Sequence, residues 1–202
     1  MTITLYGSDK SRTRRVFWTL EELGVDYVHD SIGYDDPKLK TPHYLRLNPL
    51  GAIPILADGD VLLSESLAIN LYLAKTYGSG GERPLYPSDP AEEAQAWRWS
   101  LWVQAHLEPW IQKDVRTRFL RTLAGPELAD LVAVELTKLD GVLQDRTWML
   151  GDRFTVADLN VAGVLSPSRT TQMDLSPHPN VAAWVERCYA RPAAQAVRQR
   201  WG

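Results

Sequence analysis

The first 77 residues alternate between short apolar runs and one-sided helical patterns. Four runs rich in branched and aromatic residues predict strands, and they fall at 3–6, 26–32, 53–58 and 60–63. The last two runs flank Asp58-Gly59-Asp60, a tight-turn signal that joins neighbouring strands as a hairpin. A helical pattern follows the first run, a short helical turn follows the second, and another helix follows the hairpin. This order predicts an α/β unit built on a small sheet.

The two longer helices of this region are marked by apolar spacing and by signals at their ends. From Thr13 apolar residues recur at helical spacing, and Gly24 then closes the pattern in the manner of a C-cap. The segment 64–78 begins with Ser64, which can cap a helix, and ends at Gly78. We therefore expect one helix on each side of the predicted hairpin.

The second part of the chain has only helical signals. Residues 78–90 are rich in Gly, Pro and Ser and are typical of a linker. Beyond them Thr155 and Asp158 have capping-box spacing, with Asp in place of the usual Glu, so we expect them to be structural. The chain is thus predicted to contain an α/β domain, a linker and an all-α helical domain, at 1–77, 78–90 and 91–202 respectively.

Composition narrows the classes of protein that fit. The chain has 202 residues, with 22 Lys+Arg against 25 Asp+Glu and a net charge of −3. Nucleic-acid-binding domains usually carry a basic excess, so we expect no nucleic-acid partner. No apolar run approaches the ~18 residues of a spanning helix, and the start "MTITLYG" alternates like a strand rather than a leader. We expect a protein without membrane association.

Cysteine and histidine usage excludes further chemistry. Cys188 is the single cysteine, so the chain forms no internal disulfide and has no CxxC pair for dithiol chemistry. It lies in a helical pattern and is expected to be a packed core thiol. The four histidines show no metal-ligand spacing. These features predict a cytoplasmic protein without a metal site.

The turn between the first strand and the first helix, "YGSDKSRTRRV", combines hydroxyl and basic side chains. A helix N-terminus with nearby cations and a hydroxyl donor favours an anion such as a thiolate. The alternative is that the hydroxyls only cap the helix. The hydroxyl side chains are those of Tyr6, Ser8, Ser11 and Thr13, and the cations are Lys10, Arg12, Arg14 and Arg15.

Residues 48–56, "NPLGAIPIL", contain a second candidate site. Pro54 can open a strand, where its missing amide is tolerated, and this needs no function. A cis Ile53–Pro54 bond would instead turn the Ile53 backbone outward. Its amide and carbonyl could then pair with an extended peptide, as a neighbouring strand does.

A third candidate is "LSESLA", residues 63–68, at the start of the helix after the hairpin. Exposed amides and the helix dipole attract a carboxylate there, and Glu65 can pair with an ammonium group. An α-amino acid head carries both charges, so Glu65 and Ser66 together suit such a ligand. An ordinary cap is the alternative, and we favour it for Ser64.

These features in this order resemble the glutathione transferase superfamily. The resemblance covers nearly the whole chain and rests on "NPLGAIP", on "ESLAI" after a hairpin, and on a helical second part with "FTVADL". Within the superfamily, "SRTRRVFWTLEELGVDY" is similar to a bacterial and fungal subgroup with an S-R-[ST]-x-R-[VI] run. The resemblance implies a thioredoxin-like first domain, an all-helical second domain and a homodimer.

The resemblance also implies a glutathione site in the first domain, with glutathione as co-substrate and no other cofactor. Ile53 would pair its backbone with the cysteinyl part, and Glu65 and Ser66 would hold the γ-glutamyl head. Lys40 matches a position where related enzymes place a base for the glycyl carboxylate. Ala52 is a departure, because many relatives carry Gln there and Ala offers no side-chain hydrogen bond.

Glutathione reacts as its thiolate, and the first turn offers hydroxyls that could stabilise it. A free thiol titrates near pH 8.5, and lowering this pKa by about two units requires roughly 2.7 kcal/mol. A hydrogen bond to a charged acceptor contributes roughly 1.5–3 kcal/mol. In many serine-type relatives the activating serine lies six residues before the Val of the Arg-Val pair, a position that is Lys10 here. Ser11 is one residue away and matches the subgroup run.

We therefore predict Ser11 as the catalytic thiol donor, with Ser8 and Tyr6 as alternatives. The competing interpretation of Ser11 is a plain N-cap whose oxygen is occupied by a neighbouring amide. In the second domain, "WRWSLWVQAHLEPW" puts Trp99, Trp102 and His106 on one helical face. Core packing explains most of these tryptophans, and one or two can line an apolar pocket for an electrophile.

The function predicted from these features is that of an enzyme of detoxification. A glutathione S-transferase would conjugate the glutathione thiolate to a small hydrophobic electrophile. Two other classes stay open. One is a non-catalytic member that binds glutathione or a protein partner, and the other is a glutathione-dependent peroxidase or disulfide reductase. A cysteine in the first turn would favour the reductase, and none is present.

Overall fold

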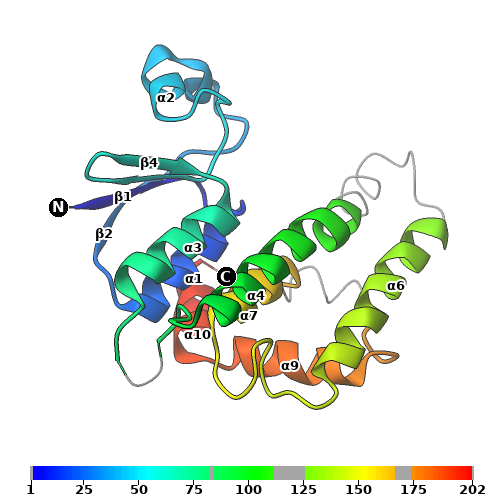
Figure 1. The fold of residues 1–202 in the computed structure, drawn as a ribbon. Coiled ribbons are helices and arrows are strands. Elements are labelled where there is room, and N and C mark those ends of the chain that lie inside the picture. Colours follow the sequence, from blue (N-terminus) through cyan, green and yellow to red (C-terminus); the bar gives the residue numbers. More distant parts are fainter. Residues whose placement is uncertain (1, 82–83, 112–125, 167–173, 202) are drawn as a thin grey trace. The chain divides into compact units, whose positions relative to one another are not determined.

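The computed structural model of the chain describes residues 2–81, 84–111, 126–166 and 174–201 (Figure 1). Its contacts divide the chain into two compact units. The first unit is formed by Met1–Tyr86 together with Arg191–Gly202, and the second by Pro87–Ala190. The first is an α/β unit and the second is helical, as the sequence predicted.

The first unit is built on a mixed sheet of four strands in the order β2-β1-β3-β4. Strand β1 is parallel to β2, and β3 is antiparallel to both β1 and β4. The two strands β3 and β4 form the predicted hairpin, and Gly59 in its turn has a φ of 58°, a left-handed value that favours glycine. The strands are β1 (Ile3–Tyr6), β2 (Tyr27–Asp30), β3 (Ile55–Asp58) and β4 (Val61–Ser64).

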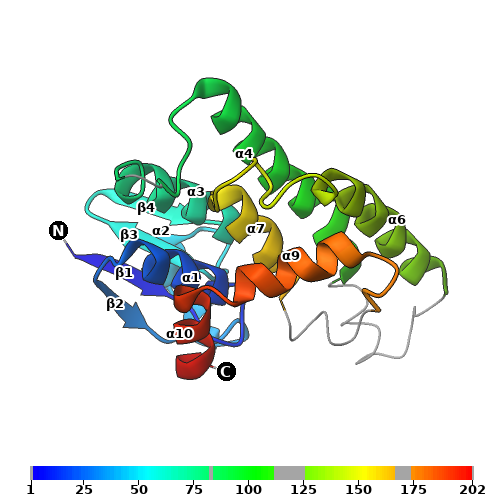
Figure 2. The ribbon, with the colours of Figure 1, turned by 90° about the horizontal axis from the view of Figure 1, so that it is seen from below.

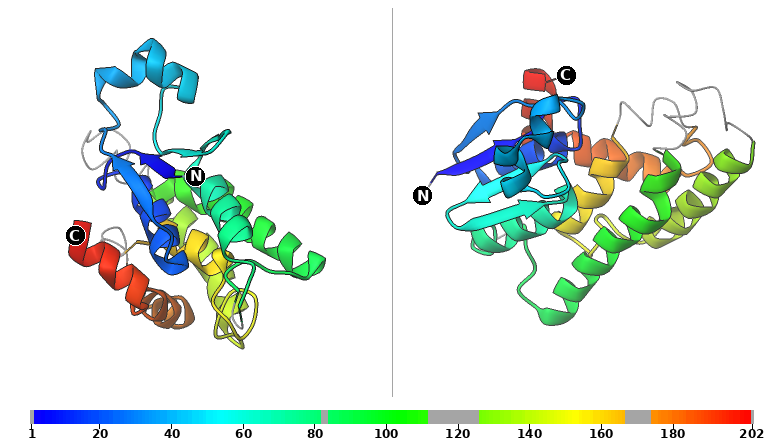
Figure 3. Two further views of the ribbon diagram at one scale, coloured as in Figure 1. Left: turned by 90° about the vertical axis from the view of Figure 1, so that its left-hand side faces the viewer. Right: turned by 90° about the horizontal axis from the view of Figure 1, so that it is seen from above.

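Helices cover both faces of this sheet. The helical elements are α1 (Thr13–Leu23), the 3-10 turn η1 (Pro37–Lys40), α2 (Pro42–Leu47) and α3 (Ser66–Tyr77). Helices α1 and α3 lie side by side on one face, and α2 lies on the opposite side (Figures 1 and 3). The buried face of α1 includes Val16, Phe17 and Leu20, which follow the predicted apolar spacing. This arrangement is the thioredoxin-like fold that the resemblance implied.

The start of α3 differs from the prediction. Ser64 ends strand β4, Glu65 occupies the N-cap, and the helix begins at Ser66. Ser64 does not cap the helix because it pairs with Ile55 across the sheet. Glu65 has a φ of 71°, which is unusual for a residue with a side chain.

A buried carboxylate fastens α3 to the hairpin. The hydroxyls of Tyr72 and Tyr77 both donate to Asp58 Oδ2, at 2.9 and 2.6 Å. The hydrogen bond to Asp58, followed by burial, raises the pKa of Tyr77 to about 12. Burial, followed by the same carboxylate, raises the pKa of Tyr72. These two bonds hold the helix against the end of β3.

The second unit is helical, and α7 is its central helix. Its helical elements are α4 (Pro90–Trp102), the π-helical turn η2 (Val103–Leu107), α6 (Pro126–Leu143), α7 (Val156–Val164) and α9 (Pro179–Tyr189). Helix α7 packs against α4, η2 and α9, and α6 packs against α9 (Figure 2). Every residue of α7 is buried. Cys188 on α9 is also buried, which agrees with a packed core thiol.

The predicted capping box at the start of α7 is present and extends further than its motif. Asp158 Oδ2 accepts from the Thr155 amide at 2.9 Å. Asp158 Oδ1 accepts from the Met149 amide at 2.7 Å and from Trp184 Nε1 at 2.9 Å. The carboxylate thus joins α7 to the preceding loop and to α9.

The C-terminal helix α10 (Pro192–Trp201) belongs to the first unit, whereas the sequence put it in the all-α domain. It packs against α1 (Figure 2). Arg191 Nε and Nη2 donate to the two carboxylate oxygens of Glu22, each at 2.7 Å. The assignment differs because a helical pattern in the sequence does not indicate which element the helix packs against.

Candidate functional site

The register of the sheet brings the three candidate segments to one end of it. Tyr6 at the end of β1 pairs with Ile55, and Ile55 pairs with Ser64 at the end of β4. Tyr6, Ile55 and Ser64 thus form one row across the sheet. Three segments leave the sheet from this row: the turn after Tyr6, the loop before Ile55 and the junction after Ser64. Neighbouring strands lie about 4.8 Å apart, so the three segments span about 10 Å.

The loop before β3 presents backbone groups for pairing. The Ile53–Pro54 bond is cis. In the described part of the chain, neither the amide nor the carbonyl of Ile53 has a hydrogen-bond partner. Asn48 holds this loop, since its Nδ2 donates to Ala52 O at 2.8 Å and its Oδ1 accepts from the Leu50 amide at 3.1 Å. Local sequence patterns did not predict this role of Asn48.

Lys40 lies against the same loop. Its Nζ donates to Gly51 O at 3.1 Å and to Leu50 O at 3.4 Å, and the side chain is exposed. An ammonium group has three donors, so one stays available for an anion. Gly51 has a φ of 57°, and a Cβ there would lie 2.8 Å from Lys40 Nζ. Glycine therefore makes room for the ammonium group beside the loop.

The start of α3 combines an exposed carboxylate with a buried cation. Glu65 is exposed, and Ser66 is 3% exposed at the first position of the helix. Arg15 on α1 is 4% exposed, and its Nη1 donates to Ser66 Oγ at 3.3 Å. The helix dipole and this guanidinium both favour an anion at the α3 N-terminus. In the sequence Arg15 is one of four basic residues of the first turn, and nothing there indicates its contact with Ser66.

The hydroxyl of Ser11 is engaged within its own turn. Ser11 Oγ donates to Ser8 O at 2.7 Å, accepts from the Thr13 amide at 3.2 Å and lies 2.7 Å from Thr13 Oγ1. The structure assigns Arg12, not Ser11, to the N-cap of α1. Ser11 thus has both the local bonds of a turn residue and a second hydroxyl within reach.

The other two candidate hydroxyls have different surroundings. Ser8 is half-buried, and its Oγ has no hydrogen-bond partner among the described residues. Tyr6 is half-buried and lies edge-on to Tyr44, with ring centroids 6.1 Å apart. Gly7 has a φ of 143°, and a Cβ there would collide with the Thr13 hydroxyl. The turn is therefore closed tightly around Thr13.

The three side chains predicted for an electrophile pocket differ in exposure. Trp99 is 4% exposed and lies edge-on to the half-buried Trp102, with centroids 5.3 Å apart. His106 is exposed. The burial of Trp99 agrees with core packing.

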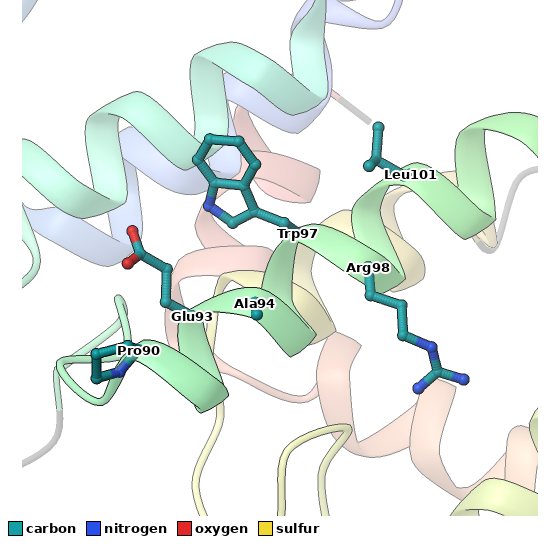
Figure 4. Close-up of a pocket in the computed structure, with 6 residues that line it drawn as sticks. All are labelled: Pro90, Glu93, Ala94, Trp97, Arg98 and Leu101. Carbon is teal, nitrogen blue, oxygen red and sulfur yellow. The ribbon is translucent and has the colours of Figure 1, made fainter.

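A groove of about 490 Å³ on α4 is lined by other residues, among them Trp97 and Leu101 (Figure 4).

Over the described ranges, no helix is long and apolar enough to cross a membrane. The same ranges contain no group of three His, Cys, Asp or Glu side chains placed to hold a metal ion.

Two parts of the chain match models of known protein domains. Residues 11–76 match the model "Glutathione S-transferase, N-terminal domain". Residues 125–192 match "Glutathione S-transferase, C-terminal domain". The two matches cover more than half of the chain and follow the order of the two units.

Curated relatives and solved structures agree over nearly the full length. The chain is 30% identical to glutathione S-transferase GstB of Escherichia coli, over 96% of this chain and 97% of that protein. It is 35% identical to glutathione S-transferase 3 of Zea mays, over 96% and 91%. A theta-class enzyme of Xanthomonas axonopodis pv. citri with glutathione bound is 30% identical over 96% of both chains, with a TM-score of 0.82. A delta-class enzyme of Nilaparvata lugens has a TM-score of 0.89 at 27% identity, over 98% and 94%. The chain therefore belongs to the glutathione S-transferase family.

Proposed function

We propose that the protein is a glutathione transferase that joins the thiolate of glutathione to a small hydrophobic electrophile. Glutathione is the co-substrate, and no further cofactor takes part. The row Tyr6–Ile55–Ser64 carries this proposal, because it brings three segments with suitable chemistry to one end of the sheet. An extended tripeptide is about 10 Å long, which is the span of three neighbouring strands.

Each part of glutathione has a partner in or beside these three segments. The γ-glutamyl head binds at the start of α3, where Glu65 pairs with its ammonium group and Ser66 with its carboxylate. The cysteinyl part pairs with the free amide and carbonyl of Ile53, which is held in place by the loop around Pro54. Lys40 pairs with the glycyl carboxylate through its remaining donor. The open backbone of Ile53 and the buried Arg15 behind Ser66 support this assignment.

The thiol then lies at the first turn, and we keep Ser11 as its hydroxyl donor. When Thr13 donates to Ser11 Oγ, the single Ser11 proton is left for Ser8 O or for the ligand. A thiolate outcompetes a neutral carbonyl for this proton, because hydrogen bonds to charged acceptors are about twice as strong. Ser8 is the competing donor because its Oγ is not engaged within the described residues, and Tyr6 follows. The run "SRTRRV" supports assignment to the bacterial and fungal subgroup.

The chemistry needs only a thiolate and a held electrophile. The thiol proton leaves to solvent as glutathione binds. The sulfur lone pair then forms a bond to an electrophilic carbon, and either a leaving group departs with its electron pair or the adjacent carbon takes a proton from water. Proximity of the two bound reactants supplies much of the rate. Trp102 and His106, together with Trp99, remain our candidates for the electrophile pocket.

Retention on immobilised glutathione, followed by a panel of substrates, tests this function. We expect retention, and turnover with aromatic or conjugated electrophiles. Retention without turnover would favour the non-catalytic class. Turnover of peroxides or disulfides alone would favour the reductase. A folded sample that is not retained would refute the proposal.

We also propose a cytoplasmic homodimer with the exposed face of α4 in its contact. Trp97 and Leu101 are 51% and 67% exposed and line the groove with Ala94 (Figure 4). Across a twofold axis, the α4 helix of a second copy would cover this exposed apolar pair. Sedimentation should give a dimer for the wild type and a monomer for Trp97→Glu. A monomeric wild type would refute this proposal.

A further inference from the structure

Arg14 connects the first turn to the other end of the chain. Its Nε donates to Asp9 O at 3.0 Å, and its Nη2 donates to the carbonyl of Trp201. The second bond joins residues 187 positions apart. The guanidinium plane thus bridges a carbonyl of the turn and a carbonyl at the end of α10, a geometry that one lysine ammonium does not reproduce.

His29 holds a second carbonyl of the same turn. Its Nε2 lies 2.7 Å from Gly7 O. A carbonyl oxygen only accepts hydrogen bonds, so this nitrogen carries the proton. The carbonyls of Gly7 and Asp9 stand on either side of Ser8, and each is held by a side chain, that of His29 on β2 and that of Arg14 on α1.

The indole of Trp201 supports His29. It stacks on Phe17 with centroids 5.0 Å apart at 15°, and it lies edge-on to His29 at 5.3 Å and 81°. His29 also lies edge-on to Phe17, at 4.9 Å and 88°. The imidazole is thus fixed by an aromatic ring on each of two helices, α1 and α10.

The helix that carries Trp201 is itself anchored to α1. The Arg191–Glu22 pair makes two bonds of 2.7 Å, and the Glu22 side chain is 8% exposed. Trp18 Nε1 also donates to Glu22, at 3.0 Å. An Arg200–Glu21 pair at 3.7 Å lies closer to the end of the helix. These contacts hold α10 against α1 and so fix the position of Trp201 beside the turn.

We propose that Arg14, His29 and Trp201 are positioning residues through which the C-terminal helix aims the hydroxyl of the first turn at the glutathione sulfur. The inference rests on the proposed function. None of the three is assigned to contact glutathione. Ser8 and Ser11 belong to one bonded turn, because Ser8 O accepts from both the amide and the hydroxyl of Ser11. Releasing the carbonyls on either side of Ser8 therefore lets both hydroxyls move. Misplacement of a donor by about 1 Å is enough to cost a large part of a catalytic contact.

Two variants test this proposal by separate routes. Arg14→Lys keeps the charge but cannot bridge the two carbonyls. Trp201→Ala removes the ring and keeps the main-chain carbonyl, and Trp201→Phe restores stacking. The charge control is Lys10→Ala, which removes an exposed cation from the same turn. Each protein is measured for the thiolate absorbance of bound glutathione against pH, for the pH profile of kcat/KM, and for the KM of glutathione.

We expect Arg14→Lys and Trp201→Ala to raise the pKa of the bound thiol by about one unit, because a displaced hydroxyl forfeits part of its bond to the thiolate. Their kcat/KM at neutral pH should fall up to about tenfold and approach the wild type at high pH. The KM of glutathione should stay unchanged, Trp201→Phe should recover most of the shift, and Lys10→Ala should shift the thiol pKa less. A role in stability alone would lower the melting temperature and leave the profile in place.

The outcomes separate this inference from the function on which it rests. If the wild type binds glutathione and neither variant moves the thiol pKa, the inference is refuted while the proposed function stands. If the wild type binds no glutathione, both are refuted. Arg14→Lys alone decides the matter if Trp201→Ala fails to fold, because it leaves the aromatic packing intact.

Discussion

Replacing Glu65 by alanine or by glycine separates the effect of its carboxylate from the effect of its backbone conformation. Both changes remove the carboxylate, and only glycine relieves the backbone. Glu65 has φ 71° and ψ 110° at the N-cap of α3. A residue with a Cβ in such a conformation costs about 1–3 kcal/mol. Alanine retains this cost, whereas glycine adopts positive φ freely.

The expected loss of glutathione affinity is the same for both variants. The exposed carboxylate is the proposed partner of the ligand ammonium group, and a hydrogen bond to a charged group contributes roughly 1.5–3 kcal/mol. The dissociation constant should therefore rise about 10- to 150-fold in each variant. Stability should differ between them. Glycine loses about 0.5–1 kcal/mol in additional chain entropy, which is less than the strain that it relieves. We expect the free energy of unfolding of Glu65→Gly to exceed that of Glu65→Ala by about 1 kcal/mol.

Titration calorimetry with glutathione and denaturant unfolding measure the two effects. Unchanged affinity in both variants would refute the assignment of Glu65 to the γ-glutamyl head. A glycine variant less stable than the alanine variant would refute the argument from strain. Because the two outcomes are independent, one can fail while the other holds.

Other parts of the chain give three further predictions. Asp158→Ala should lower the free energy of unfolding by about 3–5 kcal/mol, because it leaves several buried donors without an acceptor; a loss under about 1 kcal/mol by denaturant titration would contradict this. The folded-state pKa of Tyr77 is raised from 10.0 to about 12, so its contribution to stability is complete below pH 10 and is lost as the pH rises through 12. The stability of Tyr77→Phe at alkaline pH should lack this contribution, whereas Tyr34→Phe, a change at an exposed tyrosine, should retain it. Identical curves of stability against pH for the two variants would overturn the reasoning. Lys40→Gln should raise the KM of glutathione about tenfold, while Lys38→Gln on the same 3-10 turn should not, and equal effects would refute a specific contact.

The sequence by itself determined the local elements and most of the proposed glutathione contacts. The start of α1 at Thr13 and its end at Gly24, with φ 61°, follow from apolar spacing and from the freedom of glycine. The capping box at Thr155 likewise depends on atoms within three residues. Ile53 and Glu65 were predicted because their motifs stand in a fixed order along the chain. Such signals are readable because backbone conformation and short-range hydrogen bonds fix them.

Only the tertiary structure decided what the apolar faces and hydroxyls meet. Periodicity identified the last helix without its partner, and the contacts of Arg191 with Glu22 assigned it to the first unit. The sequence indicates only that Arg15 belongs to a basic turn, whereas the packing of α1 against α3 places it within hydrogen-bond distance of Ser66. Which oxygen accepts the Ser11 proton depends on which oxygens lie within hydrogen-bond distance once the turn closes. A contact across 187 positions, such as that of Arg14 with Trp201, leaves no pattern in the sequence, because packing and not chain spacing brings its atoms together.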